Sequence, residues 1–213
     1  MKGGLKGNGP PGAELPTRGS LSGEQVALLT YTAAGPGPTG PGIWVGDEAE
    51  LPPVPAPGTR YIGLTAARPL AGAPPGTMMG HWRFFGHTAT DWEVWDSLPR
   101  PLQLTTPQAV RAVPHTTGCQ RGGDAWSCGF RAAWQVYRAA CGLRPAAVPE
   151  AWVQFHGPAL LHHAIAQPGA RVDIDVHSGA WSPQGRHAHR DEDAAWLAAM
   201  AVACRPERAT VPP

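Results

Sequence analysis

The sequence predicts one α+β domain, and two features of its middle part carry that prediction. Aromatic residues dominate the stretches His81–Phe85 and Trp92–Asp96, which flank a short polar segment. Aromatic residues favour strands, so the two stretches are predicted to pair as an antiparallel hairpin. From Phe130 to Cys141, apolar residues recur at helical spacing. A length of 213 residues fits one compact domain with tails.

The first 60 residues are rich in glycine and proline, which oppose regular structure. The chain holds 27 glycines and 25 prolines, and the run Gly35–Gly42 consists almost entirely of them. Proline lacks a backbone donor and glycine is entropically costly to order. We therefore expect residues 1–60 to be largely disordered or irregular, with one helical piece at Gly23–Thr32. The folded domain is expected over 61–204, followed by a tail at 205–213.

Charge and hydropathy narrow the classes of partner. With 17 basic and 16 acidic residues, the net charge is +1, which offers little to neutralise phosphates. Nucleic-acid and membrane partners are therefore not expected. The longest apolar run is too short to span a bilayer, and the start lacks the apolar stretch of a secretory signal. An intracellular location, in cytoplasm or nucleus, is the expectation.

The predicted hairpin brings an imidazole and a carboxylate together. If its turn centres on Thr88 and Ala89, His81 lies directly opposite Asp96. Residues directly opposite each other point to the same face of a sheet. The two side chains are therefore expected within reach of one another.

A glycine-rich loop at Gly118–Gly123 leads to Cys128, where the central helix is predicted to begin. A thiolate at a helix N-terminus meets unpaired backbone N–H groups and the positive end of the macrodipole. The spacings of the four cysteines match no zinc pattern. The later elements are predicted as a loop at Pro99–Pro114, a helix at Leu160–Gln167, a strand at Arg171–His177 and a helix from Asp191 through Cys204.

Four residues can supply the parts of a thiol-based catalytic site. A cysteine nucleophile needs a base, a group that orients the base, and donors for the oxyanion. Cys128 is the candidate nucleophile, His81 the base and Asp96 the orienting group. The side-chain amide of Gln120 is the candidate oxyanion donor, beside the backbone N–H of Cys128.

Other residues of the same types are given simpler roles. His87 and Asp91 lie at the predicted turn, where solvated polar residues are common. Cys119 precedes no helix and is interpreted as structural, and Asp124 is interpreted as a cap for the helix that follows. A second polar cluster fits a solvated strand face as well as a metal site, so no metal or cofactor is predicted; it comprises Asp173, Asp175, His177, His187 and His189. Trp134, Trp181 and Trp196 are predicted to be core aromatics.

The ordered motifs resemble those of the cysteine proteases that remove ubiquitin-like modifiers such as SUMO and NEDD8, with the adenovirus endopeptidase as a distant relative. His81–Trp82 is similar to the family's His-Trp, Asp96–Leu98 to its Asp-Ser-Leu, and Ser127–Phe130 to its Ser-Cys-Gly-hydrophobic signature. Gln120 precedes the cysteine as the family's glutamine does, but by eight positions instead of about six. The resemblance spans about 50 residues of this chain.

The resemblance implies a papain-like fold of circularly permuted order and cleavage after the Gly-Gly terminus of a ubiquitin-like protein. Trp82 would then form a wall of the narrow channel that admits the two glycines. Two alternatives stay open: an acetyltransferase of the same clan that carries the acyl group on Cys128, and an inactive pseudoprotease that binds a modifier.

Overall fold

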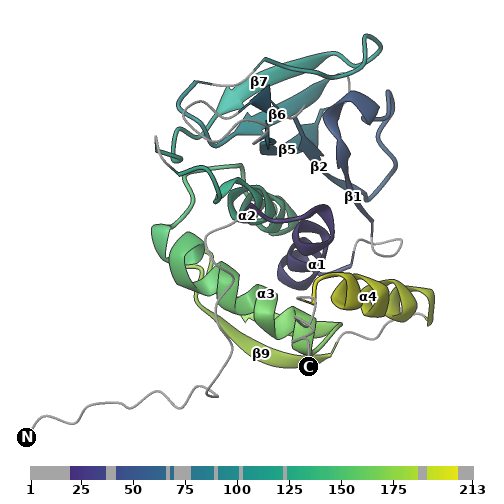
Figure 1. Ribbon diagram of the computed structural model, residues 1–213, viewed down its shortest axis with the longest axis vertical. Coiled ribbons are helices and arrows are strands. Elements are labelled where there is room, and N and C mark those ends of the chain that lie inside the picture. The colour runs from purple at the N-terminus through teal and green to yellow at the C-terminus, as the bar shows by residue number, and fades with distance from the viewer. Residues whose placement is uncertain are drawn as a thin grey trace, which may run out of the picture.

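The computed structural model describes residues 20–36, 42–65, 68–69, 78–88, 91–100, 103–121, 124–186 and 191–205. Figure 1 shows a sheet on one side of the molecule and layers of helices on the other. The α-helices are α1 (Gly23–Ala34), α2 (Cys128–Ala140), α3 (Gly157–Ala166) and α4 (Asp191–Ala203). A short 3-10 helix, η1 (Glu48–Glu50), and a short π-helix, η2 (Trp152–His156), accompany them. The predicted α+β class is confirmed. None of the helices in the described part of the chain has the length and apolar character of a membrane span.

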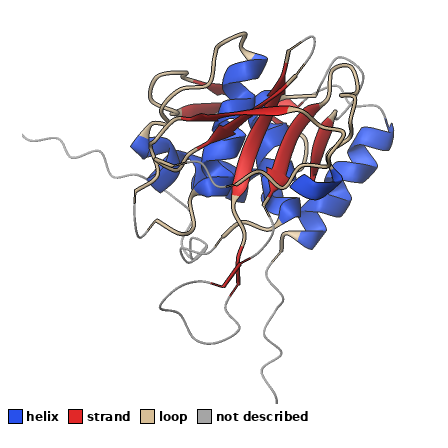
Figure 2. Cartoon of the chain, turned by 90° about the horizontal axis from the view of Figure 1, so that it is seen from above, coloured by secondary structure: helices blue, strands red, loops and turns tan. Residues whose placement is uncertain are grey.

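The main sheet has five strands in the order β1-β2-β5-β6-β7. Its three inner strands are antiparallel, whereas each edge strand runs parallel to its neighbour. The strands are β1 (Ile43–Asp47), β2 (Arg60–Leu64), β5 (Trp82–His87), β6 (Trp92–Asp96) and β7 (Ala112–Thr116). Two small two-stranded sheets complete the fold: β3 (Arg68–Pro69) with β4 (Met78–Met79), and β8 (Ala170–Ile174) with β9 (Trp181–Arg186). Figure 2 shows the main sheet with helices packed beneath it.

Helix α1 corrects the predicted domain boundary. The helical piece at Gly23–Thr32 is confirmed, but it lies inside the fold: all residues from Val26 to Ala33 are buried. Ser22 and Gln25 form a capping box, with each side chain bonded to the other's backbone N–H. The helix packs against α2, α3 and α4, and β1 joins the main sheet. The expectation that the folded domain begins near residue 61 is therefore wrong; within the described residues it includes 20–36 and 42–60.

The predicted hairpin exists, but its register is shifted by two residues. Phe84 pairs with Trp95 and His87 with Trp92, whereas a turn centred on Thr88 and Ala89 would pair Phe85 with Trp92. His81 is thus not directly opposite Asp96. A shift of two residues leaves every side chain on its predicted face, because side chains alternate with a period of two.

Two further predicted boundaries need correction. The stretch Pro99–Pro114, predicted as a loop, ends inside strand β7, whose Pro114 pairs with Val94. A proline is tolerated there because β7 is an edge strand. The strand predicted at Arg171–His177 stops at Ile174, where a tight turn begins. The helices predicted near α2, α3 and α4 are all present.

Two hydrophobic clusters pack against opposite faces of the main sheet. The larger one joins the helices to the inner face and contains Cys128, Trp134 and Trp82. The smaller one lies on the outer face around Tyr61 and Val94. Of the three tryptophans predicted to be core aromatics, Trp134 is fully buried; Trp181 and Trp196 pack against the larger cluster.

Candidate active site

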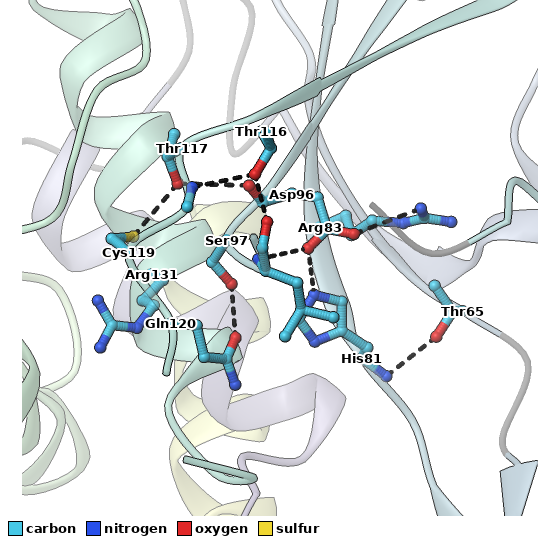
Figure 3. Close-up of polar contacts among 12 residues, drawn as sticks. Thr65, His81, Arg83, Asp96, Ser97, Thr116, Thr117, Cys119, Gln120 and Arg131 are labelled. Carbon is cyan, nitrogen blue, oxygen red and sulfur yellow. Dashed lines mark hydrogen bonds and ion pairs between the residues drawn. The ribbon is translucent and has the colours of Figure 1, made fainter. Parts of the chain in front are cut away.

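His81 and Asp96 meet as the sequence predicts. His81 directly precedes β5, where its backbone N–H donates to Thr65 Oγ1 and its carbonyl accepts from the Thr65 N–H. Asp96 is the last residue of β6. The distance between His81 Nε2 and Asp96 Oδ1 is 2.7 Å, and the same oxygen accepts from the backbone N–H of Leu98 at 2.8 Å. Figure 3 shows the imidazole and the carboxylate facing each other between the two strands.

Cys128 reaches the same imidazole from the helical layer. It is the first residue of α2, which packs against β5. Burial lowers the pKa of His81, but hydrogen bonds and charges from Asp96 and Cys128 outweigh it and raise the pKa to about 9. Because Nε2 is bonded to Asp96, Nδ1 is the ring nitrogen that remains for the thiol. The fold therefore brings together the candidate nucleophile, base and orienting group.

Gln120 is held rigidly in the loop before α2. Its side chain is buried, its Oε1 accepts from Ser97 Oγ at 2.6 Å, and its Nε2 donates to the carbonyl of Asp124. Its backbone N–H donates to the Ser97 carbonyl at 2.8 Å. An amide nitrogen carries two hydrogens, so one remains for another acceptor. These contacts fix the amide group but do not by themselves assign it an oxyanion.

Asp124 binds Ser127, the residue directly before α2, instead of capping the helix itself as its interpretation from the sequence suggested. Its Oδ1 accepts from the Ser127 N–H at 3.1 Å, and its Oδ2 accepts from Ser127 Oγ at 2.5 Å. Arg131, one turn into the helix, binds both partners: Nε donates to Ser127 Oγ at 2.8 Å and Nη2 to Asp124 Oδ2 at 3.1 Å. The sequence analysis did not identify Arg131. It could have been noticed as the one cation within the buried first turns of α2.

Trp82 packs into the larger core cluster. Its side chain is 5% exposed, and Nε1 donates to the Leu21 carbonyl at 3.0 Å, which ties the strand to the start of α1. The cavity that Trp82 lines with Trp95 and Ser97 holds only about 10 Å³. Cys128 itself is 1% exposed. The candidate site is thus closed in this structure.

Behind Asp96 lies a second pair of charges that the sequence analysis did not identify. Arg83 Nη1 is 3.6 Å from Asp96 Oδ2. Arg83 also donates from Nε to Glu48 Oε2 at 3.0 Å and from Nη2 to Glu48 Oε1 at 2.5 Å. Arg83 is the available signal in the sequence, because it is the only charged residue of an aromatic strand.

The residues that compete for these roles lie elsewhere. His87 is exposed at the end of β5. Asp91 accepts from Arg111 Nε at 3.1 Å at the far end of β6. Cys119 is half-buried, with its Sγ 3.2 Å from Thr117 Oγ1.

The second polar cluster forms a turn. Asp175 Oδ1 accepts from the backbone N–H groups of His177 and Ser178 and from Ser178 Oγ. These bonds lower the pKa of Asp175. His187 and His189 lie outside the described residues. Within the described ranges, no three side chains of metal-ligating type gather at one point.

Comparison with known proteins finds no similar protein for this chain. The chain matches no protein-family model, no curated protein and no solved structure.

Proposed function

We propose that the protein is a cysteine peptidase or isopeptidase that cleaves after the Gly-Gly terminus of a ubiquitin-like modifier. The observation that supports this most strongly is the placement of His81 between Asp96 and Cys128. A pKa of about 9 for His81 favours an imidazolium at neutral pH, and an imidazolium in this position can give a proton to the leaving group.

In the proposed reaction, the Cys128 thiolate attacks the carbonyl carbon of the scissile bond. The C–S bond forms as the carbonyl π electrons move to oxygen, where the backbone N–H of Cys128 and the free amide hydrogen of Gln120 would donate. The His81 imidazolium gives its proton to the leaving amine, and the C–N bond breaks to leave a thioester. Water, deprotonated by neutral His81, then hydrolyses the thioester and releases a carboxylate.

The modifier specificity rests on the motif resemblance and not on a substrate cleft. Trp82 would form the channel wall only if its packing against Leu21 loosens in the bound state, because the indole is now buried. Exclusion of side chains larger than hydrogen would make the specificity for glycine partly steric. The papain-like architecture belongs to the same proposal.

Covalent capture tests the proposal. The purified chain is incubated with ubiquitin, SUMO and NEDD8 probes that carry a C-terminal electrophile, beside Cys128→Ala and the matched buried-thiol control Cys204→Ala. We expect one of the probes to add its mass to the wild type and to Cys204→Ala but not to Cys128→Ala.

Three results would overturn it. If the adduct still forms with Cys128→Ala, Cys128 is not the nucleophile. Tight binding of a modifier without an adduct would favour the pseudoprotease. Labelling of Cys128 by radioactive acetyl-CoA, without any probe adduct, would favour the acetyltransferase.

A further inference from the structure

A buried line of charges extends the candidate triad away from the thiol. The side chains of Glu48 and Arg83 are both 0% exposed, and that of Asp96 is 1% exposed. Glu48 and Arg83 form a two-pronged ion pair, in which both guanidinium contacts are hydrogen bonds. The pair is further satisfied by the loop after β6: the Thr105 N–H donates to Glu48 Oε1 at 2.8 Å, and Arg83 Nη2 donates to the Gln103 carbonyl at 3.3 Å.

Asp96 is held on both of its oxygens by this arrangement. Oδ1 bonds to His81 Nε2 at 2.7 Å, while Oδ2 faces Arg83 Nη1 at 3.6 Å. Arg83 and Asp96 come from neighbouring antiparallel strands, so the contact is set by the register of the hairpin. A carboxylate fixed on Oδ2 cannot rotate away from the imidazole without losing a second partner.

Stability alone does not account for three buried charges in a row. Removing charges from water is costly, and apolar residues of similar volume often replace a buried ion pair without loss of stability. We propose that Glu48 and Arg83 are positioning residues of the candidate active site: Arg83 fixes the Asp96 carboxylate toward His81, and Glu48 balances the Arg83 charge. The expected effect on turnover rests on the proposed function. The expected effect on the His81 pKa can be measured separately.

The direction of the expected change in the His81 pKa follows from the charged groups around the ring. Asp96 from β6 and Cys128 from α2 face the ring; Arg83 from β5 and Glu48 from η1 lie behind Asp96. Glu48→Gln would leave the Arg83 charge unbalanced and would thereby weaken the pull of Asp96 on the imidazolium. Removing both charges, in Glu48→Gln/Arg83→Met, would restore that pull while also removing the support of Oδ2.

The test is an NMR titration of the His81 ring in the full isotope-labelled chain, assigned with His81→Gln. For Glu48→Gln we expect the His81 pKa to fall by about half a unit to one unit. For the double variant we expect a His81 pKa at or above that of the wild type. If the Glu48–Arg83 ion pair had no influence on His81, the His81 pKa would not fall in Glu48→Gln and recover in the double variant. Arg111→Met, which breaks the exposed pair with Asp91, is the matched control and should change nothing.

Kinetics supply the second readout and keep the test decisive if Glu48→Gln does not fold. In the double variant we expect kcat to fall about tenfold with KM unchanged, because Asp96 loses orientation and not substrate contact. Arg83→Lys, which keeps the charge, should recover part of the loss. A double variant with full kcat, or a His81 pKa that is the same in every folded variant, would overturn the inference. If no variant or wild type has activity but the pKa shifts occur, the proposed function fails and the electrostatic coupling stands.

Discussion

Cys128 and Cys204 are both buried thiols in the larger core cluster, yet their surroundings are opposite. Burial and, to a smaller extent, the nearby charge of Glu24 raise the pKa of Cys204 to about 11. Cys128 is as deeply buried but begins α2 and faces His81. The surroundings of Cys204 thus disfavour its ionised form, whereas an imidazole and a helix N-terminus distinguish the surroundings of the candidate nucleophile. The predictions below break or sharpen this difference.

The largest effect is expected for His81→Gln, which removes the base and leaves Cys128 with the helix N-terminus alone. We expect turnover of a modifier-amide substrate to fall by about 10³-fold, within the range for loss of a general acid and base. Steady-state kinetics measure the loss. A decrease smaller than threefold would contradict the role given to His81.

The pH dependence of stability tests the raised pKa of His81, the imidazole that Cys128 faces. His81 has a folded pKa of about 9, above its ordinary value of 6.5, so its contribution is fully present below pH 6.5. It is lost as the pH rises through 9, and it amounts to about 3 kcal/mol of unfolding free energy. Urea unfolding of wild type and His81→Gln at pH 6 and pH 9 should show a steeper decline for the wild type. Parallel declines would contradict the shift.

Asp96→Asn is expected to reduce activity less than the loss of His81, by about tenfold to a hundredfold, because the imidazole stays but loses its charged partner. The same variant should lower the His81 pKa. Kinetics and the His81 titration measure the two effects. An unchanged rate would remove Asp96 from the site.

The smallest effect is expected for Cys204→Ala. The kinetics should equal those of the wild type, and the unfolding free energy should fall by about 1 kcal/mol, since a small apolar contact is lost. The part of the decline in stability between pH 9 and pH 11 that comes from the unfolded thiol ionising before the folded one should be lost in this variant, so its decline should be shallower than that of the wild type. A change in activity would contradict the separation of the two thiols.

The sequence predicted the contact between His81 and Asp96 and the start of α2 more closely than it predicted the limits of the folded domain. The contact between His81 and Asp96 follows from strand alternation, so an error of two residues in register left both on one face. The start of α2 at Cys128 was also predictable, because the apolar spacing and the preceding glycine-rich loop mark it.

What the sequence did not show depends on tertiary contacts. The helix at α1 was predicted, but the glycine and proline content around it did not show that it is buried on nearly all sides and packs against α2 and α3. The edge strands pair in parallel across long connections, which no local pattern reveals. Glu48 is similarly distant: it lies 35 positions from Arg83, its bonded partner, in a short turn with no periodic signal.

The strand order also implies a sequence of events in folding. The β5–β6 hairpin needs only a short turn, so His81 and Asp96 can meet early, at a low cost in loop-closure entropy. Cys128 joins them only when α2 docks against β5 and α1. In a chain whose core is not yet assembled, Cys128 is therefore still apart from His81 and Asp96, and the complete candidate site exists only in the fully packed fold.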